Sequence, residues 1–335
     1  MQDKTIKQML LFGGSETLPQ SPEQLLKNRE KPNPFSPVVA SFGAGRNSTA
    51  MLILCQKLRI KVDLILFADT GGELPETYAF IAFFSQWLKN NGMPEVTVVK
   101  RQESKNNIDR VNYRSAVRVL KFLLTKKCNQ LIPWAIWWVK VCSSSYSTLE
   151  EECLVLQTLP SVAFGRKGCS QKWKAEPQER FIKKWRENMN IPKDVPTRHL
   201  KGIHAKEVYR LIDKQGRFKF DHPEVRNEYP LVEHGLDDWA CEVLIKSVGL
   251  PIPPKSSCFF CPNRKIKEVN DLHPEVKLRG ELIEQVAING EFWRGESSIA
   301  KGLGRRFRWS EIGQLTDLEK AALAFSEQKI CNCVD

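Results

Sequence analysis

The chain has 335 residues, of which 41% are hydrophobic and 27% are charged. These ordinary globular values exclude a disordered, collagen-like or coiled-coil chain. The formal net charge of +12 indicates a surface that attracts polyanions, either nucleic acid or a phosphate-rich small molecule.

The sequence shows no sign of membrane insertion or secretion. No apolar run reaches the roughly 18 residues of a transmembrane helix, and residues 1–10 lack the apolar core of a secretory signal. We therefore expect a cytoplasmic protein without a membrane partner. In a reducing cytoplasm the 10 cysteines are expected to be thiols or metal ligands rather than disulfides.

Apolar runs alternate with helical spacing after a polar, proline-containing segment. Residues 1–36 form this segment, which we expect to be a loosely ordered arm. The predicted strands are residues 38–42, 62–68 and 96–99, and the predicted helices are residues 49–58, 75–89 and 109–125. This alternation predicts an α/β fold with a doubly wound parallel sheet.

The pattern changes near residue 160. We expect residues 37–160 to form a nucleotide-binding core and residues 161–335 to form a smaller, cysteine-containing C-terminal region that closes over the sheet. The second region has short elements and many basic residues. Helical spacing returns there at residues 238–247, 275–288 and 317–326.

A glycine-containing loop joins the first predicted strand to the helix after it. Its glycines let the backbone curl so that several amides face one anion, and the helix N-terminus adds partial positive charge. A plain strand-to-helix connection, capped by Asn47 or Ser48, is the alternative. The candidate phosphate ligands of this loop are Ser41, Phe42, Gly43, Gly45, Arg46, Asn47, Ser48 and Thr49.

A second polar turn ends the next predicted strand. Asp69, Thr70 and Gly71 lie there, at the carboxyl edge where doubly wound sheets bind ligands. Asp69 is a candidate ligand for Mg²⁺ or for a nucleotide hydroxyl. Glu73 and Glu76 could instead be ordinary acidic residues in the first turn of the following helix, and for Glu76 we favour this interpretation.

These two loops carry a resemblance to a known family. With the Ser41 loop, Asp69-Thr70-Gly71 and Pro75-Glu76-Thr77, the chain resembles the phosphoadenosine phosphosulfate (PAPS) reductase family, within the PP-loop ATP pyrophosphatases. The resemblance implies an adenine nucleotide alpha-hydrolase-like fold that binds ATP or a related adenylate with Mg²⁺. It extends in islands over residues 38–262, and residues 202–210 are similar to the family's later phosphate- or sulfate-binding segment, which ends at Arg210.

The chain also departs from the family's pattern. Related pyrophosphatases carry Gly-Lys-Asp-Ser where this chain has Gly-Arg-Asn-Ser, and the neutral Asn47 is a poorer magnesium ligand than aspartate. His204 stands where the reductases have arginine. The reductases' Glu-Cys-Gly-(Ile/Leu)-His tail motif is absent from the sequence.

Several cysteines have the spacing or surroundings of metal ligands or reactive thiols. Cys258 and Cys261 form a two-thiolate knuckle, and Cys169 lies among lysines that favour its thiolate. In one assignment, suggested by the resemblance, these three hold an iron–sulfur cluster; in the other, Cys258 and Cys261 join Cys331 and Cys333 around a structural Zn²⁺. A redox dithiol or two buried thiols is the alternative without metal. The cysteines expected in the core are Cys55, Cys128, Cys142, Cys153 and Cys241.

Two basic segments also contain aromatic residues. Residues 301–309 mix cations with Phe307 and Trp309, as surfaces that bind single-stranded nucleic acid do; the alternative is a charged loop with both rings packed inward. Residues 165–174 form a second patch, beside Cys169. The candidate nucleic-acid contacts are Lys172, Lys174, Arg305, Arg306 and Arg308.

Three functions fit these observations. The first is ATP-dependent sulfur transfer, in which an oxygen of tRNA or DNA is adenylated and then replaced by sulfur from a cysteine desulfurase or another donor. The second is reduction of adenylyl sulfate or phosphoadenylyl sulfate, and the third is a non-catalytic nucleotide-sensing or nucleic-acid-binding module. The positive net charge favours the first. Asp69 and Cys169 are the candidate catalytic residues.

Overall fold

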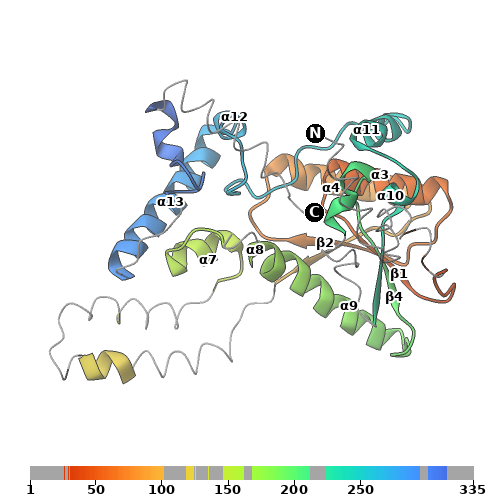
Figure 1. The fold of residues 1–335 in the computed structure, drawn as a ribbon, viewed down its shortest axis with the longest axis horizontal. Helices are drawn as coiled ribbons and strands as arrows, with labels where there is room; N and C mark the ends of the chain where they lie inside the picture. Colours follow the sequence, from red (N-terminus) through yellow and green to blue (C-terminus); the bar gives the residue numbers. More distant parts are fainter. Residues whose placement is uncertain are drawn as a thin grey trace, which may run out of the picture.

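A five-stranded sheet lies in the right half of the molecule as drawn in Figure 1. The computed structural model describes residues 26, 29, 31–101, 118–123, 125, 135, 146–161, 168–211, 224–294 and 301–314. All neighbouring strands pair in parallel, in the order β3-β2-β1-β4-β5. The strands are β1 (Val38–Ser41), β2 (Leu64–Asp69), β3 (Val96–Lys100), β4 (Thr197–Leu200) and β5 (Val225–Glu228). The predicted α/β fold with a parallel sheet is therefore confirmed.

Helices cover both faces of the sheet because its central strands are apolar on both sides. Ile65 and Phe67 of β2 face a core shared with α3 (Arg46–Lys57), α4 (Pro75–Asn90) and α11 (Asp238–Lys246). Leu64 and Leu66 point the other way, toward α9 (Glu176–Asn188), whose Ile182 is buried against them. This alternation follows from the two-residue period of a strand.

A second apolar cluster lies beside the carboxyl edge of the sheet. It joins Leu74 at the start of α4 to the Cys258 knuckle and to α13. The helices α7 and α13 of this cluster lie side by side on the left in Figure 1. The remaining elements are α7 (Leu149–Leu156), α8 (Gly168–Ser170), the π-helical η2 (Gln171–Ala175), the 3-10 helix η3 (Ala205–Arg210), α10 (Pro230–Glu233), α12 (Ile266–Asn270), α13 (Pro274–Arg294) and the 3-10 helix η4 (Trp309–Gln314).

The sheet crosses the boundary that we expected near residue 160. Both β4 and β5 come after that residue, yet β4 pairs directly with β1. Part of the expected arm also contacts the sheet, since Arg29 donates a 2.8 Å hydrogen bond to the carbonyl oxygen of Asn227 in β5. The predicted helix at 317–326 and most of the one at 109–125 lie outside the described residues.

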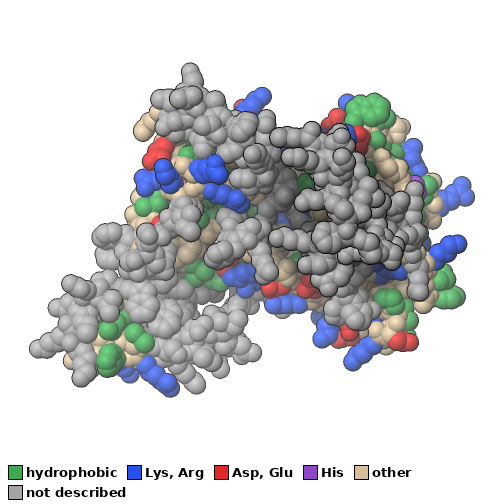
Figure 2. All heavy atoms as spheres, in the orientation of Figure 1, with side chains coloured by type: hydrophobic (Ala, Val, Ile, Leu, Met, Phe, Trp, Pro, Cys, Tyr) green, Lys and Arg blue, Asp and Glu red, His purple; other side chains and the backbone are tan. Residues whose placement is uncertain are grey.

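The surface carries positive charge in several places. Lys and Arg side chains are spread over both parts of the molecule on the face shown in Figure 2, rather than gathered in one patch. In the described part of the chain, no helix is both long enough and apolar enough to cross a membrane.

Candidate functional site: two loops at the carboxyl edge

The loop after β1 leads into the N-terminus of α3. Ala44 adopts a left-handed φ of 58°, and Gly45 caps the helix in an extended conformation. Thr49 N and Thr49 Oγ1 both donate to the Gly45 carbonyl, at 3.1 and 2.8 Å. The first amides of a helix have no partner within the helix and carry partial positive charge. The amides at the start of α3 therefore form a site suited to an anion.

A second loop lies directly against this helix start. It follows β4, the neighbour of β1, and contains Gly202. A Cβ atom at residue 202 would lie 2.7 Å from both N and Cα of Ser48, closer than real Cβ contacts. Only glycine therefore allows this approach. Sheet topology thus brings the predicted later phosphate-binding segment, residues 202–210, to the predicted phosphate loop.

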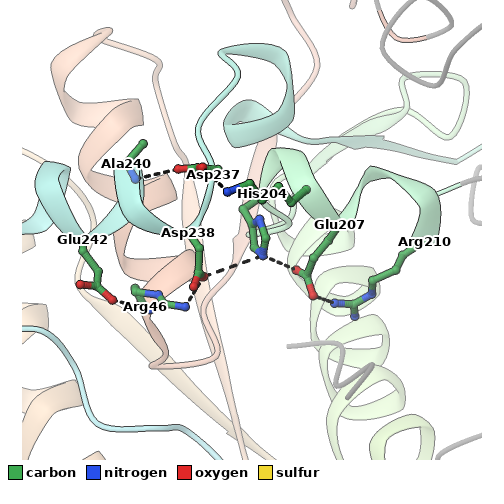
Figure 3. A network of polar contacts seen from close by, with 9 residues as sticks. Arg46, His204, Glu207, Arg210, Asp237, Asp238, Ala240 and Glu242 are labelled. Atoms are coloured by element: carbon green, nitrogen blue, oxygen red, sulfur yellow. Dashed lines mark hydrogen bonds and ion pairs between the residues drawn. The ribbon is translucent and has the colours of Figure 1, made fainter. Parts of the chain in front are cut away.

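A chain of polar contacts connects the two loops to α11 (Figure 3). Arg46 pairs with Asp238 and with Glu242, the latter at 2.5 Å. His204 Nε2 lies 3.8 Å from the same Asp238 carboxylate and 3.5 Å from Glu207 Oε2. The cation that we expected to contact phosphate is therefore held by two carboxylates of α11.

The far end of this network is the predicted terminal arginine. Arg210 Nη1 donates a 2.6 Å hydrogen bond to Glu207 Oε1, and the Arg210 side chain is only 9% exposed. Buried polar groups normally have hydrogen-bond partners. Among the described residues, the buried polar atoms around the two loops that lack one are Arg46 Nε, Asn47 Oδ1, His204 Nδ1 and Arg210 Nη2. These unpartnered atoms suit a polar ligand.

Ser41, at the end of β1, is tied to two residues that sequence reasoning missed. Its hydroxyl donates to Gln178 Oε1 of α9 at 2.8 Å and lies 2.7 Å from His199 Nε2 of β4. Burial, followed by the nearby Lys201 charge, lowers the pKa of His199 to about 3, so the imidazole is neutral at physiological pH. The sequence does not indicate a role for Gln178, because this residue lies on an ordinary amphipathic helix. His199 lies on β4, a strand that the sequence pattern does not predict, so its place beside Ser41 could not be foreseen.

Asp69, at the end of β2, organises the neighbouring turn. Its Oδ1 atom accepts hydrogen bonds from Gly71 N at 2.8 Å and from the Tyr78 hydroxyl at 2.7 Å. Lys100 Nζ lies 3.1 Å from Oδ2. Burial and the Asp69 carboxylate raise the pKa of Tyr78 well above its ordinary value, so the phenol stays protonated and donates. Strand, turn and α4 are held together by this one carboxylate.

Comparison with known families identifies this architecture. Residues 37–132 match the phosphoadenosine phosphosulfate reductase domain. This domain belongs to the PP-loop, adenine nucleotide alpha-hydrolase-like superfamily, as the resemblance implied. A comparison with curated proteins finds no match.

The residues that match the PAPS reductase domain cover part of the site. The match spans the phosphate loop, the Asp69 turn and strands β1 to β3. It supports an enzyme of the PP-loop superfamily that uses an adenine nucleotide. The segment that ends at Arg210 and the Cys258 knuckle lie beyond the matched residues, so their roles stay predictions.

The Cys258 knuckle docks on the Asp69 turn, which lies within the matched residues. Cys258 Sγ lies 3.1 Å from Thr70 Oγ1 and 3.9 Å from Glu73 Oε1. Phe259 N donates a 2.8 Å hydrogen bond to the carbonyl oxygen of Gly72. Burial, then the Glu73 carboxylate, raises the pKa of Cys258 well above its ordinary value, although the Lys174 charge opposes this. Cys258 is therefore a protonated thiol at the sheet edge.

The described thiols and carboxylates do not come together as a metal site. These residues contain no group of three or more His, Cys, Asp or Glu side chains arranged to hold a metal ion. Cys169 is half-buried in the same apolar cluster as Cys258, but the two do not form a cluster site with Cys261. Cys331 and Cys333 lie outside the described residues, so the zinc assignment stays a prediction.

The two lysines predicted to contact nucleic acid face acidic side chains. Lys172 pairs with Glu152, and Lys174 Nζ lies 3.6 Å from Glu73 Oε1. Burial, then the nearby Arg101 charge, lowers the pKa of Lys172 to about 8. This patch is therefore partly neutralised by buried carboxylates.

The basic segment at 301–309 folds around one buried carboxylate. Glu284 of α13 accepts hydrogen bonds from Leu303 N at 2.7 Å and from Trp309 N at 3.1 Å. Phe307 and Trp309 are 4% and 1% exposed, so both rings pack inward as in the alternative interpretation. The rings cannot stack on nucleic acid, whereas Arg306 is exposed.

Proposed function

We propose that the protein is an ATP-dependent sulfurtransferase that adenylates an acceptor oxygen in nucleic acid and then replaces this oxygen with sulfur. The observation that carries the proposal is the 3.1 Å contact between Cys258 Sγ and Thr70 Oγ1. It brings a thiol to the Asp69 turn at the carboxyl edge of the sheet, where we expect the nucleotide to bind.

The first step uses the phosphate loop. The acceptor oxygen attacks the α-phosphorus of ATP, and pyrophosphate leaves. The amides at the start of α3, beside Gly202, are suited to hold the pyrophosphate and to stabilise the charge that develops on it. Asp69, the candidate Mg²⁺ ligand, contacts donors of the protein through both of its carboxylate oxygens.

The second step needs a sulfur nucleophile. A persulfide donor, such as a cysteine desulfurase, transfers its outer sulfur to a cysteine thiol of this chain. That sulfur attacks the activated atom of the acceptor, and AMP leaves with the original oxygen. The transferred sulfur now bridges the acceptor and the first cysteine. A second thiol attacks the sulfur of that cysteine and displaces the thiolated product, which leaves a disulfide between the two cysteines. A thiol reductant then supplies two electrons to restore both thiols. Cys258 and Cys169 are our candidates for the two thiols.

The alternative reaction is reduction of adenylyl sulfate or phosphoadenylyl sulfate. The match to the PAPS reductase domain favours it. The absence of the Glu-Cys-Gly-(Ile/Leu)-His tail weighs against it. The net charge of +12 supports nucleic acid as the acceptor, because cations that neutralise backbone phosphates supply most of the affinity for nucleic acid.

The test measures pyrophosphate release from ATP and sulfur incorporation separately, with and without bulk tRNA or DNA. We expect Cys258→Ser and Cys169→Ser to retain nucleic-acid-stimulated pyrophosphate release and to lose sulfur incorporation. Cys241→Ser is the matched control, since this thiol is buried in the core beside α3 rather than at the edge. Intact ATP binding without any pyrophosphate release would instead support the non-catalytic module suggested by Asn47.

A further inference from the structure

A cavity of about 420 Å³ lies between the Asp69 turn, the Cys258 knuckle and α13. Its size falls in the range of small-molecule sites, roughly 300–1,000 Å³. The residues of its wall that bear on a ligand are Gly71, Glu73, Tyr78, Phe259, Val276 and Arg279. No residue of the cavity belongs to the phosphate loop.

The walls of the cavity combine two aromatic rings with a fixed cation. The Arg279 guanidinium lies 4.5 Å from the centre of the Phe259 ring, and Arg279 Nε donates a 3.1 Å hydrogen bond to Glu150. The Tyr78 hydroxyl is tied to Asp69 at 2.7 Å. Aromatic rings and guanidinium planes are the groups on which proteins stack nucleobases. A pre-positioned set of this kind suits a flat heteroaromatic ring.

The cavity lies beside the two groups that the proposed reaction uses, the Asp69 turn and the Cys258 thiol. Gly71 and Tyr78 in its wall both donate to Asp69, on the nucleotide side. Glu73 in its wall lies 3.9 Å from Cys258 Sγ, on the thiol side. A ring placed there would lie beside both the Asp69 turn and the Cys258 thiol.

We propose that this cavity binds the nucleobase of the acceptor nucleic acid, with Tyr78, Phe259 and Arg279 as stacking residues. The inference rests on the proposed function and names the site of its acceptor. The largely apolar wall does not suit a triphosphate, which the amides of α3 serve better. The base of a bound ATP shares the same chemistry, so the experiment separates these two sources.

The experiment measures the affinity of end-labelled, mixed-sequence single-stranded RNA and DNA at several salt concentrations. We expect Tyr78→Ala and Arg279→Ala to weaken oligonucleotide binding about tenfold each, the size of one lost stacking contact. Tyr78→Phe keeps the ring and should stay within about twofold of the wild type. Arg180→Ala is the matched control, because the Arg180 side chain is 66% exposed on α9, away from the cavity.

The salt dependence shows whether a base or a phosphate is bound. For a single strand, loss of one phosphate contact reduces the magnitude of the slope of log K against log salt by about 0.7, whereas loss of a stacking ring leaves the slope unchanged. We expect an unchanged slope for Tyr78→Ala. A slope that falls with the affinity, or affinities equal to that of Arg180→Ala, would overturn the assignment.

The affinity for ATP separates the two sources of the base. Arg279→Ala should leave ATP binding within about twofold of the wild type, since stacking on the acceptor alone is lost. A parallel tenfold loss of ATP affinity would mean that the cavity holds the base of ATP, which overturns the proposal. Failure of the proposed function is seen separately, as absence of pyrophosphate release in the wild-type protein.

Discussion

The hydroxyl groups of the phosphate loop are engaged within the protein. Ser41 donates to Gln178, and Thr49 donates to a carbonyl of its own loop. Ser48 also donates to that carbonyl, at 3.2 Å, and accepts from an amide of the loop. A hydroxyl has one proton to donate. These residues therefore shape the loop, and its remaining backbone amides and Arg46 Nε are the donors left for an anion.

His199 should make the stability of the protein depend on pH. Its pKa is about 3 in the folded protein, against an ordinary value of 6.5. Between these values the unfolded chain binds a proton that the folded protein does not, so the folded state is stabilised as pH rises and loses stability as pH falls below 6.5. In this window, we expect protonation of His199 in the unfolded chain to lower the free energy of unfolding by about 1.4 kcal/mol for each unit by which the pH falls.

The measurement is urea unfolding of the wild type and of His199→Gln at pH 7 and pH 5. Glutamine keeps a donor that reaches Ser41 but does not titrate. The stability advantage of the wild type over the variant should therefore shrink at the lower pH, whatever the carboxylates of both proteins contribute. An advantage that is constant or grows would show that His199 is not held neutral.

At the scale of elements, the site depends on β4 lying beside β1. The loops that follow these two strands meet at the start of α3, and Gly202 is the point of contact. Gly202→Ala would place a methyl group against the Ser48 amide and move the second loop away from the helix start. We expect ATP affinity to fall at least about tenfold, the scale of one lost charge-assisted hydrogen bond.

Gly313→Ala is the matched control for this substitution. A Cβ atom at residue 313 meets no atom within 4 Å, and its backbone is not left-handed. Both variants are compared by calorimetric titration with ATP and by thermal unfolding. Equal ATP affinities in the two variants would refute the role given to Gly202, and thermal unfolding shows whether a loss reflects misfolding instead.

Elements were predictable where local apolar spacing decides the structure. β2 is buried along its whole length, and α3, α4 and α11 each have a buried face, so their sequences carried a clear signal. β4 and β5 are polar by comparison and were not predicted. They are held by a cross-strand pair, in which Arg198 Nε donates to Glu228 Oε1 at 2.9 Å. No window of a single sequence reveals such a pair.

The same limit applies to the site. The phosphate loop and the Asp69 turn were predictable because glycine and acidic residues follow predicted strands. The contact of Cys258 with Thr70 spans 188 residues of sequence, and that of Arg46 with Asp238 spans 192. Contacts of this length depend on the assembled fold, so neither spacing nor composition indicated them.

At the scale of the whole molecule, the site is built from both halves of the chain. The phosphate loop and the Asp69 turn precede residue 160, while β4, the Gly202 loop and the Cys258 knuckle follow it. A Cβ at Gly72 would lie 2.7 Å from the Phe260 ring, so the knuckle fits closely on the turn. The two halves are thus joined within the sheet and again at its carboxyl edge.

This organisation predicts how fragments of the chain behave. A fragment of residues 1–160 lacks β4, β5 and α9, which leaves β1 unpaired on one side and one face of the sheet uncovered. We expect it to lose the cooperative thermal unfolding of the full chain. A fragment of residues 1–256 keeps all five strands and α11, whose Ile245 is buried in the core between the sheet and its helices. We expect this fragment to unfold cooperatively, at a lower temperature than the full chain. Circular dichroism melting of both fragments checks this, and a cooperative transition in the fragment 1–160 would show that its sheet is stable without the strands that complete the site.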